Sequence, residues 1–493
     1  MKRVTIIGGG FSGLSAACYS AKQGHEVTLL EKNSTIGGRA RFFNRDGFTF
    51  DMGPSWYWMP DVFEKFFNDF GKSTSDFYNL TKLDPGFRIH FSNKPPLNVP
   101  ASVEELYATF ESIEKGSASK LKTFLAEAEL KYDIGMSQLA YKPSVSWLEF
   151  MNTEVLSGVL KTKFFSSVRN TVRKTFKDER LVALMEFPVL FLGTKPQDTP
   201  SLYTLMNHAA LTQGTYYPMG GMLKITEAFA ELAKSLGVTI ITDCNVSHIS
   251  VTNGSVSTIE TNKGGFTADA VIGSADYHHI EQHLLDKQYR NYDEKYWKGR
   301  TLAPSALIYY IGVNKKIKGL THHNLFFDAN FEKHTGEIYD HPAWPQDPLF
   351  YLCAPSVTDP HVAPEGHENL FVLIPIAPGL NDTQEVRESY LSGVIKRIEK
   401  ETGESIAPHI LFSQPYSISD YVKDYNAFKG NAYGLANTLF QTAVLKPSVR
   451  SKKVKNLFYA GQLTVPGPGV PPAIISGEIA AGQVTKYLKQ KAA

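Results

Sequence analysis

The chain opens with short apolar runs that alternate with segments of small residues. Residues 4–7 are mostly apolar and lead straight into a cluster of glycines at 8–13. Small residues at helical spacing follow until Gly24, and a second apolar run, residues 27–30, ends on Glu31. Short apolar runs bounded by glycine indicate buried strands, whereas apolar positions three or four apart indicate a helix. The first forty residues therefore predict strand, glycine turn, helix, strand and acid in that order.

Residues 60–215 show mainly helical periodicity, with short strand-like pieces near residues 87–91. Asp61 precedes an aromatic stripe at helical spacing and is expected to cap that helix. Residues 181–192 carry a single charged side chain, and Pro188 predicts a break within them. Such an apolar run is most often buried core, but it could also line an apolar tunnel or lie on a membrane surface.

The later parts of the chain return to the strand and turn pattern of the first forty residues. A helix ending near Leu236 precedes a strand at 238–241, an antiparallel meander over 245–267 with an Asn253-Gly254 turn, and a buried strand at 270–273. Residues 305–313 and 369–377 predict strands of a second sheet. A final strand at 456–461 leads through a Gly/Pro turn into a helix over 473–488.

The opening segment has the spacing of a dinucleotide-binding unit. Gly8 permits the tight turn, Gly10 lets the backbone approach a pyrophosphate, and Gly13 lets the helix lie close to the strand. The N-terminus of the helix offers free N–H groups to phosphates, and Glu31 can accept hydrogen bonds from ribose hydroxyls. The alternative is a βαβ unit of the same shape that binds no nucleotide.

A second glycine-rich loop follows at Gly37-Gly38-Arg39. Paired glycines before an arginine suit a loop whose backbone passes close to a ligand, with a cation beside its phosphates. A surface turn carrying an exposed arginine is the alternative. The position of the loop directly after Glu31 favours the ligand-binding interpretation.

Composition narrows the choice of function. A hydrophobic content of 42% and a charged content of 20% over 493 residues indicate a folded chain of two or three domains. The formal net charge of +2 gives no indication of nucleic-acid binding. The three cysteines have no redox or metal spacing, which indicates a reducing, cytoplasmic compartment. The N-terminus lacks a signal-peptide pattern, and no apolar run reaches the ~20 residues that a spanning helix needs, so any membrane contact is expected from the surface.

Two histidine pairs, His278-His279 and His322-His323, are the only candidates for a metal site. Neither pair has a carboxylate or cysteine at a useful spacing, and neighbouring histidines point in different directions on most backbones. We therefore expect no metal.

Several motifs resemble one flavoprotein superfamily. The run from Gly8 to Arg39 resembles the FAD-binding start of amine oxidases and carotenoid desaturases. Residues 50–55, residues 355–366 and the Pro466–Pro471 turn, which Ser476-Gly477 follows, resemble the bacterial-type phytoene desaturase branch. The resemblance implies an α/β fold, with a Rossmann-like FAD-binding domain of the glutathione-reductase/amine-oxidase type interleaved with a mixed-sheet plus helical substrate domain.

The same resemblance implies which segments and residues do what. The FAD-binding domain is expected to consist of residues 1–71, 214–290 and 422–493, and the substrate-binding and membrane-associated region of residues 72–213 and 291–421. The expected cofactor-binding residues are Gly8, Gly10, Phe11, Ser12, Gly13, Glu31, Lys32, Gly38, Arg39, Gly53, Pro54, Ser55, Val246, Gly461, Gly469 and Val470. No catalytic residue can be named.

The expected function is desaturation of a linear C40 carotenoid of the phytoene type by hydride transfer to FAD. The partners are then a lipophilic carotenoid, a membrane surface, and oxygen or a quinone as electron acceptor. Three alternatives stay open. The chain could desaturate a hydroxylated or end-modified carotenoid, or act as a carotenoid isomerase or retinol-saturase-like enzyme. It could also be a flavin-free prenyl-binding escort protein that shares this fold.

Overall fold

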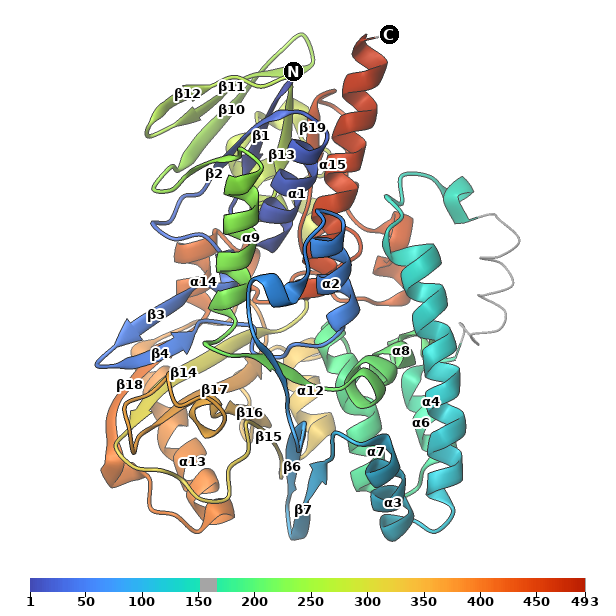
Figure 1. Ribbon diagram of the computed structural model, residues 1–493, viewed down its shortest axis with the longest axis vertical. Helices are drawn as coiled ribbons and strands as arrows, with labels where there is room; N and C mark the ends of the chain where they lie inside the picture. The colour runs from blue at the N-terminus through green and yellow to red at the C-terminus, as the bar shows by residue number, and fades with distance from the viewer. Residues whose placement is uncertain (151–165, 493) are drawn as a thin grey trace.

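The computed structural model describes residues 1–150 and 166–492 (Figure 1). Two large sheets lie at opposite ends of an elongated molecule, and helices cover them. The five-stranded sheet has the order β19-β13-β1-β2-β9, and every pairing in it is parallel. Its strands are β1 (Arg3–Ile7), β2 (Glu26–Leu30), β9 (Thr239–Ile241), β13 (Ala270–Gly273) and β19 (Leu457–Tyr459).

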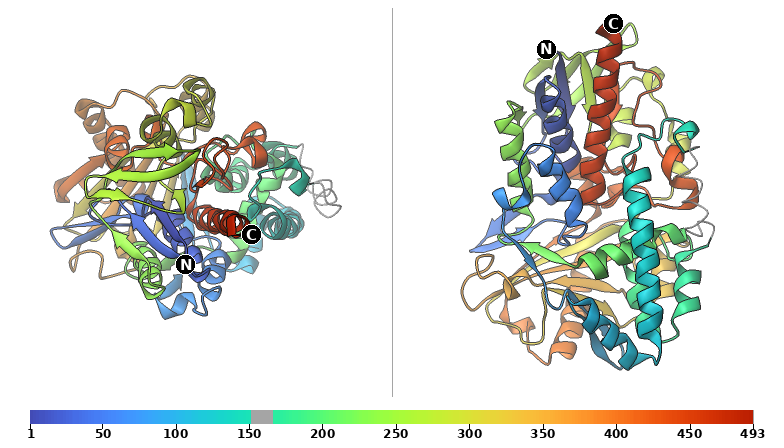
Figure 2. Two further views of the ribbon diagram at one scale, coloured as in Figure 1. Left: turned by 90° about the horizontal axis from the view of Figure 1, so that it is seen from above. Right: turned by 45° about the vertical axis from the view of Figure 1, so that its right-hand side comes forward.

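The predicted strand–turn–helix–strand unit is present as β1, α1 (Phe11–Lys22) and β2. Small residues on α1 let α15 (Val470–Ala492) lie directly against it, as the view from above in Figure 2 shows. A Cβ on Gly477 of α15 would come within 2.4 Å of the carbonyl oxygen of Ser12. The two ends of the chain therefore meet in one helical layer, which also contains α9 (Leu223–Ser235).

The predicted meander forms a separate small sheet of β10 (Val246–Thr252), β11 (Ser255–Thr261) and β12 (Gly264–Phe266). Asn253 and Gly254 both have positive φ angles, 52° and 73°, as a tight hairpin turn of this kind requires.

The seven-stranded sheet has the order β18-β14-β17-β16-β15-β6-β7 and is mixed, because β15 pairs with β6 in parallel. Its central strands are almost wholly buried, as expected for a sheet covered on both faces. The strands are β6 (Phe87–Phe91), β7 (Lys94–Val99), β14 (Ser305–Val313), β15 (His323–Phe327), β16 (Phe350–Cys353), β17 (Glu368–Ile376) and β18 (Ile410–Tyr416).

Helices surround the two sheets (Figure 1). Beside the seven-stranded sheet lie α12 (Phe331–Tyr339) and α13 (Gln384–Thr402), and a helical layer on the other side consists of α3 (Val103–Ile113), α4 (Ser117–Ile134), α6 (Val168–Thr175), α7 (Glu179–Glu186) and α8 (Leu205–Asn207). The other α-helices in the described part of the chain are α2 (Pro60–Asn68), α10 (Tyr277–His279), α11 (Glu294–Lys298) and α14 (Ile418–Tyr425). Two short ribbons, β3 (Phe42–Arg45) with β4 (Phe48–Asp51) and β5 (Leu80–Lys82) with β8 (Tyr216–Pro218), join the two ends.

The apolar run 181–192 is mainly buried core, and its helix stops where proline predicted a break. The α-helix ends at Glu186, and residues 187–192 continue as a 3-10 helix. The helical prediction for 60–215 is otherwise confirmed apart from the strands β5 and β7, and the strand-like piece predicted at 87–91 is β6. Residues 151–165 lie outside the described part of the chain. No helix among the described residues is long and apolar enough to span a bilayer.

The prediction that Asp61 caps its helix is wrong. The helix begins one residue earlier, at Pro60, with Met59 as its N-cap. Proline suits the first helical position because the helix needs no N–H there. The Asp61 carboxylate instead accepts a hydrogen bond from the Tyr132 hydroxyl at 2.7 Å, a contact between residues 71 positions apart.

Candidate functional site

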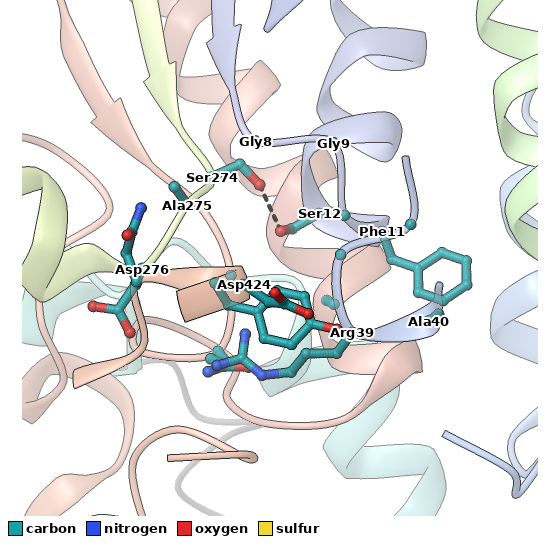
Figure 3. A pocket seen from close by; sticks show the side chains of 18 of the residues that line it. Gly8, Gly9, Phe11, Ser12, Arg39, Ala40, Ser274, Ala275, Asp276 and Asp424 are labelled. Carbon is teal, nitrogen blue, oxygen red and sulfur yellow. Dashed lines mark hydrogen bonds between the residues drawn. The ribbon is translucent and has the colours of Figure 1, made fainter. Parts of the chain in front are cut away.

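A long cavity runs along the carboxyl ends of the parallel strands, where four loops from distant parts of the chain meet (Figure 3). The loops follow β1, β2, β13 and β19. Of the sixteen residues predicted from the sequence, fourteen line this cavity: Gly8, Gly10, Phe11, Ser12, Glu31, Lys32, Gly38, Arg39, Gly53, Pro54, Val246, Gly461, Gly469 and Val470.

The glycines of the first loop are needed for three different reasons. Gly8 has φ +107°, and a Cβ there would lie 2.8 Å from the amide nitrogen of Ala275. A Cβ on Gly13 would lie 1.9 Å from the carbonyl oxygen of Gly8, so this glycine permits the close packing of α1. The nearest atom to a Cβ on Gly10 is the Cα of Gly38, 3.8 Å away, so Gly10 leaves space open toward the second glycine loop.

The N-terminus of α1 faces the cavity. Gly10 is its N-cap and offers no side chain to the free N–H groups of the first turn, which also lacks acidic residues. The hydroxyls of Ser12 and Ser274 are 2.7 Å apart and point toward each other at this end of the helix (Figure 3). Free N–H groups and the positive end of the helix dipole make this point suitable for a phosphate.

Glu31 lies at the carboxyl end of β2 and is only 4% exposed. One carboxylate oxygen accepts the Gly9 backbone N–H at 2.8 Å, and the other accepts both the backbone and the side-chain N–H of Asn33 at 2.9 Å. Glu31 therefore holds the glycine loop in place as well as lining the cavity. The oxygen that accepts from Gly9 keeps a second lone pair with which to accept a ribose hydroxyl.

Arg39 places a cation across the cavity from α1. Its guanidinium donates to the carbonyl oxygen of Asn431 at 3.0 Å and lies 5.1 Å from the ring centroid of Tyr425. Its Nε is buried and has no hydrogen-bond partner among the described residues. A buried donor without an acceptor is costly, and a phosphate or another polar ligand atom at this point would remove that cost. The side chain thus fits a bound dinucleotide.

The far end of the cavity is apolar. Met52 and Pro54 line it together with Ile308 and Leu373 of the seven-stranded sheet. Gly53 lies between them, and a Cβ on it would be 2.5 Å from the carbonyl oxygen of Arg39. Three tyrosines complete this wall: Tyr421, Tyr425 and Tyr433. A flat ring bound here would lie between the cofactor loops and the sheet.

Two of the sixteen predicted residues do not line the cavity. Gly13 lies behind the glycine loop, where its role is packing. The Ser55 hydroxyl is directed elsewhere, 2.9 Å from the hydroxyl of Tyr351, because the chain turns from the cavity wall toward the seven-stranded sheet after Pro54.

Several lining residues were missed by the sequence analysis. Asp276 follows β13, caps α10 by accepting the backbone N–H of His279 at 3.0 Å, and has its pKa raised by burial. Asp424 on α14 forms an ion pair with Arg41 at 2.5 Å. The small residues Ser274 and Ala275, which follow a buried strand, could have indicated that Asp276 lies at the cavity. No local pattern marked Asp424.

The fold brings Cys353, a third candidate metal ligand, close to His322 and His323, although it lies far from them in the sequence. β15 pairs with β16 so that His323 lies opposite Cys353, and one ligand atom from each of the three residues lies within 4.8 Å of the others. Burial lowers the pKa of His322 to about 3 and raises that of Cys353 to about 12, so the imidazole is neutral and the thiol keeps its proton. The absence of a bound metal stays a prediction.

Comparison with known proteins agrees with this geometry. Residues 11–485 match the family described as flavin containing amine oxidoreductase. A carotenoid 3,4-desaturase from Haloarcula japonica is 42% identical over 96% of each chain. A zeta-carotene-forming phytoene desaturase from Myxococcus xanthus is 29% identical over 97% of this chain and 93% of its own. The crystal structure of an oxidoreductase from Methanosarcina mazei shares the fold, with a TM-score of 0.63 at 17% identity over 98% of this chain and all of that one.

FAD, the cofactor of flavin-containing oxidoreductases, carries a pyrophosphate and a ribose, and the buried, unpaired Arg39 nitrogen and the open glycine loop suit such groups. The chain belongs to the family of flavin-containing amine oxidoreductases, in the group that includes the carotenoid desaturases.

Proposed function

We propose that the protein is an FAD-dependent carotenoid desaturase that introduces conjugated double bonds into a linear C40 carotenoid of the phytoene type. The observation that carries this proposal is the 42% identity, over 96% of each chain, to a carotenoid 3,4-desaturase. The cavity supports it, because its polar end suits a dinucleotide and its other end is apolar.

In this proposal each part of the cavity binds one part of FAD. The N-terminus of α1 and the Arg39 guanidinium hold the pyrophosphate, and Glu31 accepts the ribose hydroxyls. The backbone of Val246 lies beside the adenine. The remaining predicted residues that line the cavity near the flavin ring are Gly53, Pro54, Gly461, Gly469 and Val470, with Lys32 near the ribose end.

Bound FAD supplies the hydride acceptor for oxidation of a C–C single bond. The chain orients the substrate and keeps water away from the reacting carbons. Tyr421 and Ile308 are 4% and 0% exposed, so the wall they form is dry. The carbon that loses hydride is stabilised by the neighbouring conjugated bonds, and the adjacent proton can then leave without a strong base.

The domain organisation follows from the same proposal. Residues 1–71, 214–290 and 422–493 form the cofactor unit, and residues 72–213 and 291–421 form the substrate unit. The largest apolar cluster joins the seven-stranded sheet to the helical layer and includes Leu181, Leu202 and Tyr416. This interior is where we place the long hydrocarbon substrate.

An apolar patch suggests how a membrane-dissolved substrate reaches this interior. The patch consists of Val145, Trp147, Leu148, Phe440 and Leu445, half of the large apolar side chains that are exposed among the described residues. Leu148 is 76% exposed and Phe440 78%. The two segments that carry the patch lie side by side in every view of Figures 1 and 2. Exposed Trp, Leu and Phe together are typical of a surface that inserts into a bilayer.

The patch also lies close in sequence to the cofactor cavity. Tyr433 lines that cavity, and the same segment reaches Phe440 seven residues later. We place the protein at the cytoplasmic face of a membrane, which fits its three buried, unpaired cysteines. Oxygen or a quinone from the bilayer then completes the cycle as electron acceptor.

Vesicle sedimentation tests the membrane proposal. The double variant Trp147→Ser/Leu148→Ser should lose most of its binding to phospholipid vesicles, since it removes two of the most exposed apolar side chains of the patch. Leu411→Ser is the matched control, because Leu411 is 52% exposed on β18 and lies outside the patch. Equal binding by the wild type and the double variant would refute the role of the patch.

Product analysis tests the enzymatic proposal against its rivals. Cells that make phytoene and express this chain should accumulate carotenoids that have lost pairs of hydrogen atoms and absorb at longer wavelengths. A product of unchanged mass would instead indicate an isomerase, and a gain of hydrogen a saturase. Protein that purifies without flavin would indicate an escort protein.

A further inference from the structure

Two segments of the chain gather positive charge next to the apolar patch. Residues 292–300 and 450–455 together contain seven lysines and arginines but only two acids, Asp293 and Glu294. Their formal net charge is therefore +5, although the whole chain has a net charge of only +2. The rest of the chain is thus slightly acidic, and the positive charge of the protein is concentrated in these two segments. A local concentration of this kind attracts anions, whatever the net charge of the whole molecule.

The two segments lie side by side, and their cations alternate with tyrosine rings. The Lys452 ammonium lies 5.1 Å from the ring centroid of Tyr292, and the Tyr292 ring stacks on that of Tyr296 at 4.2 Å. The Arg300 guanidinium lies 4.4 Å from the ring centroid of Tyr296. The Lys452 backbone N–H also donates to the side-chain oxygen of Asn291 at 2.7 Å. Residues far apart in the sequence therefore form one continuous surface.

This surface presents its charge to solvent. We define the basic surface as Tyr292, Tyr296, Lys298, Arg300, Lys452 and Lys453. The three lysines are exposed, whereas the two tyrosines and the arginine are half-buried. Half-buried tyrosine rings beside exposed cations are typical of side chains at the boundary between a bilayer and water.

The two acids of these segments are engaged in other contacts. The Asp293 carboxylate accepts the backbone N–H of Tyr296 at 2.8 Å and so caps α11. The Glu294 carboxylate lies 3.7 Å from the Nε2 of His278. The charges of the exposed lysines therefore remain accessible to an anionic partner.

The basic surface continues into the apolar patch. Thr301, which follows Arg300, donates its backbone N–H to the Gln441 Oε1 at 3.0 Å, and its carbonyl oxygen accepts the Gln441 Nε2 at 2.8 Å. Gln441 directly follows Phe440, which belongs to the patch and is 78% exposed. Cations next to exposed apolar side chains suit a membrane, where the apolar groups insert and the cations contact lipid phosphates. A nucleic-acid surface would not require the exposed apolar side chains.

We propose that the basic surface binds the headgroups of anionic phospholipids while the apolar patch inserts into the same leaflet. Each lysine or arginine held near an anionic bilayer strengthens binding by about fivefold, whereas an uncharged bilayer offers these cations no such attraction. The patch alone would bind both kinds of bilayer equally. The inference rests on the proposed function, because it names the lipid class that the membrane contact of this desaturase recognises.

Vesicles of two compositions test this directly. The flavin-loaded wild type should bind vesicles of phosphatidylcholine mixed with about one third phosphatidylglycerol at least about tenfold more tightly than vesicles of phosphatidylcholine alone. Raising the salt concentration from about 0.05 M to about 0.5 M should reduce this preference, because salt screens exposed charges. Sedimentation of the vesicles measures the bound fraction in each case.

Two charge variants locate the effect. Lys452→Gln/Lys453→Gln removes two exposed cations and should weaken binding to the phosphatidylglycerol vesicles by at least about tenfold, with little change for phosphatidylcholine alone. Lys396→Gln/Lys400→Gln is the matched control, because both lysines are exposed on α13. In Figure 1 this helix lies at the opposite end of the molecule from β19, the strand that follows residues 450–455. The control should bind both kinds of vesicle as the wild type does.

The patch variant separates the two contributions. Trp147→Ser/Leu148→Ser should weaken binding to both kinds of vesicle, since insertion of apolar side chains does not depend on headgroup charge. Its remaining binding should still favour phosphatidylglycerol. Loss of this preference in the patch variant, with the basic surface intact, would contradict an independent role for the lysines.

Several results would overturn the inference. They are equal binding of the wild type to both kinds of vesicle, an unchanged preference in Lys452→Gln/Lys453→Gln, an equal loss in the control, and lysine-dependent binding of duplex DNA without any binding to vesicles. None of these measurements requires turnover, so they separate the inference from the proposed function. A preference that depends on Lys452 and Lys453 supports the basic surface even where no carotenoid is desaturated, and its absence overturns the surface even where desaturation proceeds.

Discussion

Replacing Glu31 with alanine should weaken FAD binding and loosen the glycine loop together. In the wild type the carboxylate accepts the backbone N–H groups of Gly9 and Asn33, at 2.8 and 2.9 Å. Glu31→Ala leaves both donors without their acceptor, at a cost of about 1–3 kcal/mol for each one that stays buried. The apoprotein should therefore melt at a lower temperature than the wild type.

Glu31→Ala should also weaken FAD binding, in addition to destabilising the apoprotein. A carboxylate that accepts ribose hydroxyls contributes about 1.5–3 kcal/mol, since hydrogen bonds to charged groups are stronger than neutral ones. The dissociation constant of FAD should then rise by about ten- to a hundredfold. Glu31→Gln keeps the size of the side chain, but either orientation of its amide turns an NH2 group toward Gly9 or Asn33. This variant should therefore also lower the melting temperature of the apoprotein and raise the dissociation constant of FAD.

Titration of the apoproteins with FAD, followed by quenching of flavin fluorescence, measures the affinities. Glu26→Ala is the matched control, because Glu26 is an exposed acid at the start of the same strand, β2. It removes the same charge but should leave the FAD affinity unchanged. If Glu31→Ala bound FAD as tightly as Glu26→Ala, the assignment of Glu31 to the ribose would be refuted.

Two further changes test other parts of the account. Gly10→Val should abolish FAD binding, because its methyl groups would fill the space that Gly10 leaves open toward Gly38; stoichiometric flavin in the purified variant would contradict this. Lys446→Met should raise the free energy of unfolding near pH 7 by up to about 5 kcal/mol, since burial lowers the lysine pKa from 10.5 to about 7. The advantage should shrink as pH rises from 7 to 10.5, where the unfolded lysine also becomes neutral, and should stay constant below pH 7. Thermal melts at pH 7 and pH 10 of the protein without substrate measure it, and an advantage independent of pH would show that the lysine is not buried unpaired.

Local patterns were enough to predict the cofactor half of the fold. The order β1, α1, β2 follows from apolar periodicity, and the roles of Gly8 and Gly13 follow from backbone sterics that any βαβ unit of this kind shares. The same reasoning failed for Asp61, because a proline at the first helical position is also a good start and the carboxylate found a partner, Tyr132, far away in the sequence.

The parts of the site that depend on tertiary contacts could not be read from spacing. Asp424 and Tyr425 reach the cavity from α14, and they pack beside Arg41 and Arg39, which are nearly four hundred positions earlier. The contact of His323 with Cys353 arises from the register between β15 and β16. Strand register depends on burial of one face and on the turn geometry, so a pattern of single residues does not specify it.

The same limit applies to Lys446 and Asn437. Each is one polar residue in a segment without a motif, and only the fold brings their side chains to Gly467. What the sequence did contain was the Gly/Pro turn itself, recognised by its resemblance to desaturases.

Anaerobic mixing of the purified, flavin-loaded protein with a carotenoid in liposomes tests the central claim most directly. We predict that the flavin absorbance bleaches and that one new carbon–carbon double bond appears in the carotenoid for each flavin reduced. A flavin that stays oxidised with every acyclic carotenoid, but bleaches on addition of a water-soluble amine, would contradict the account and identify an amine oxidase instead.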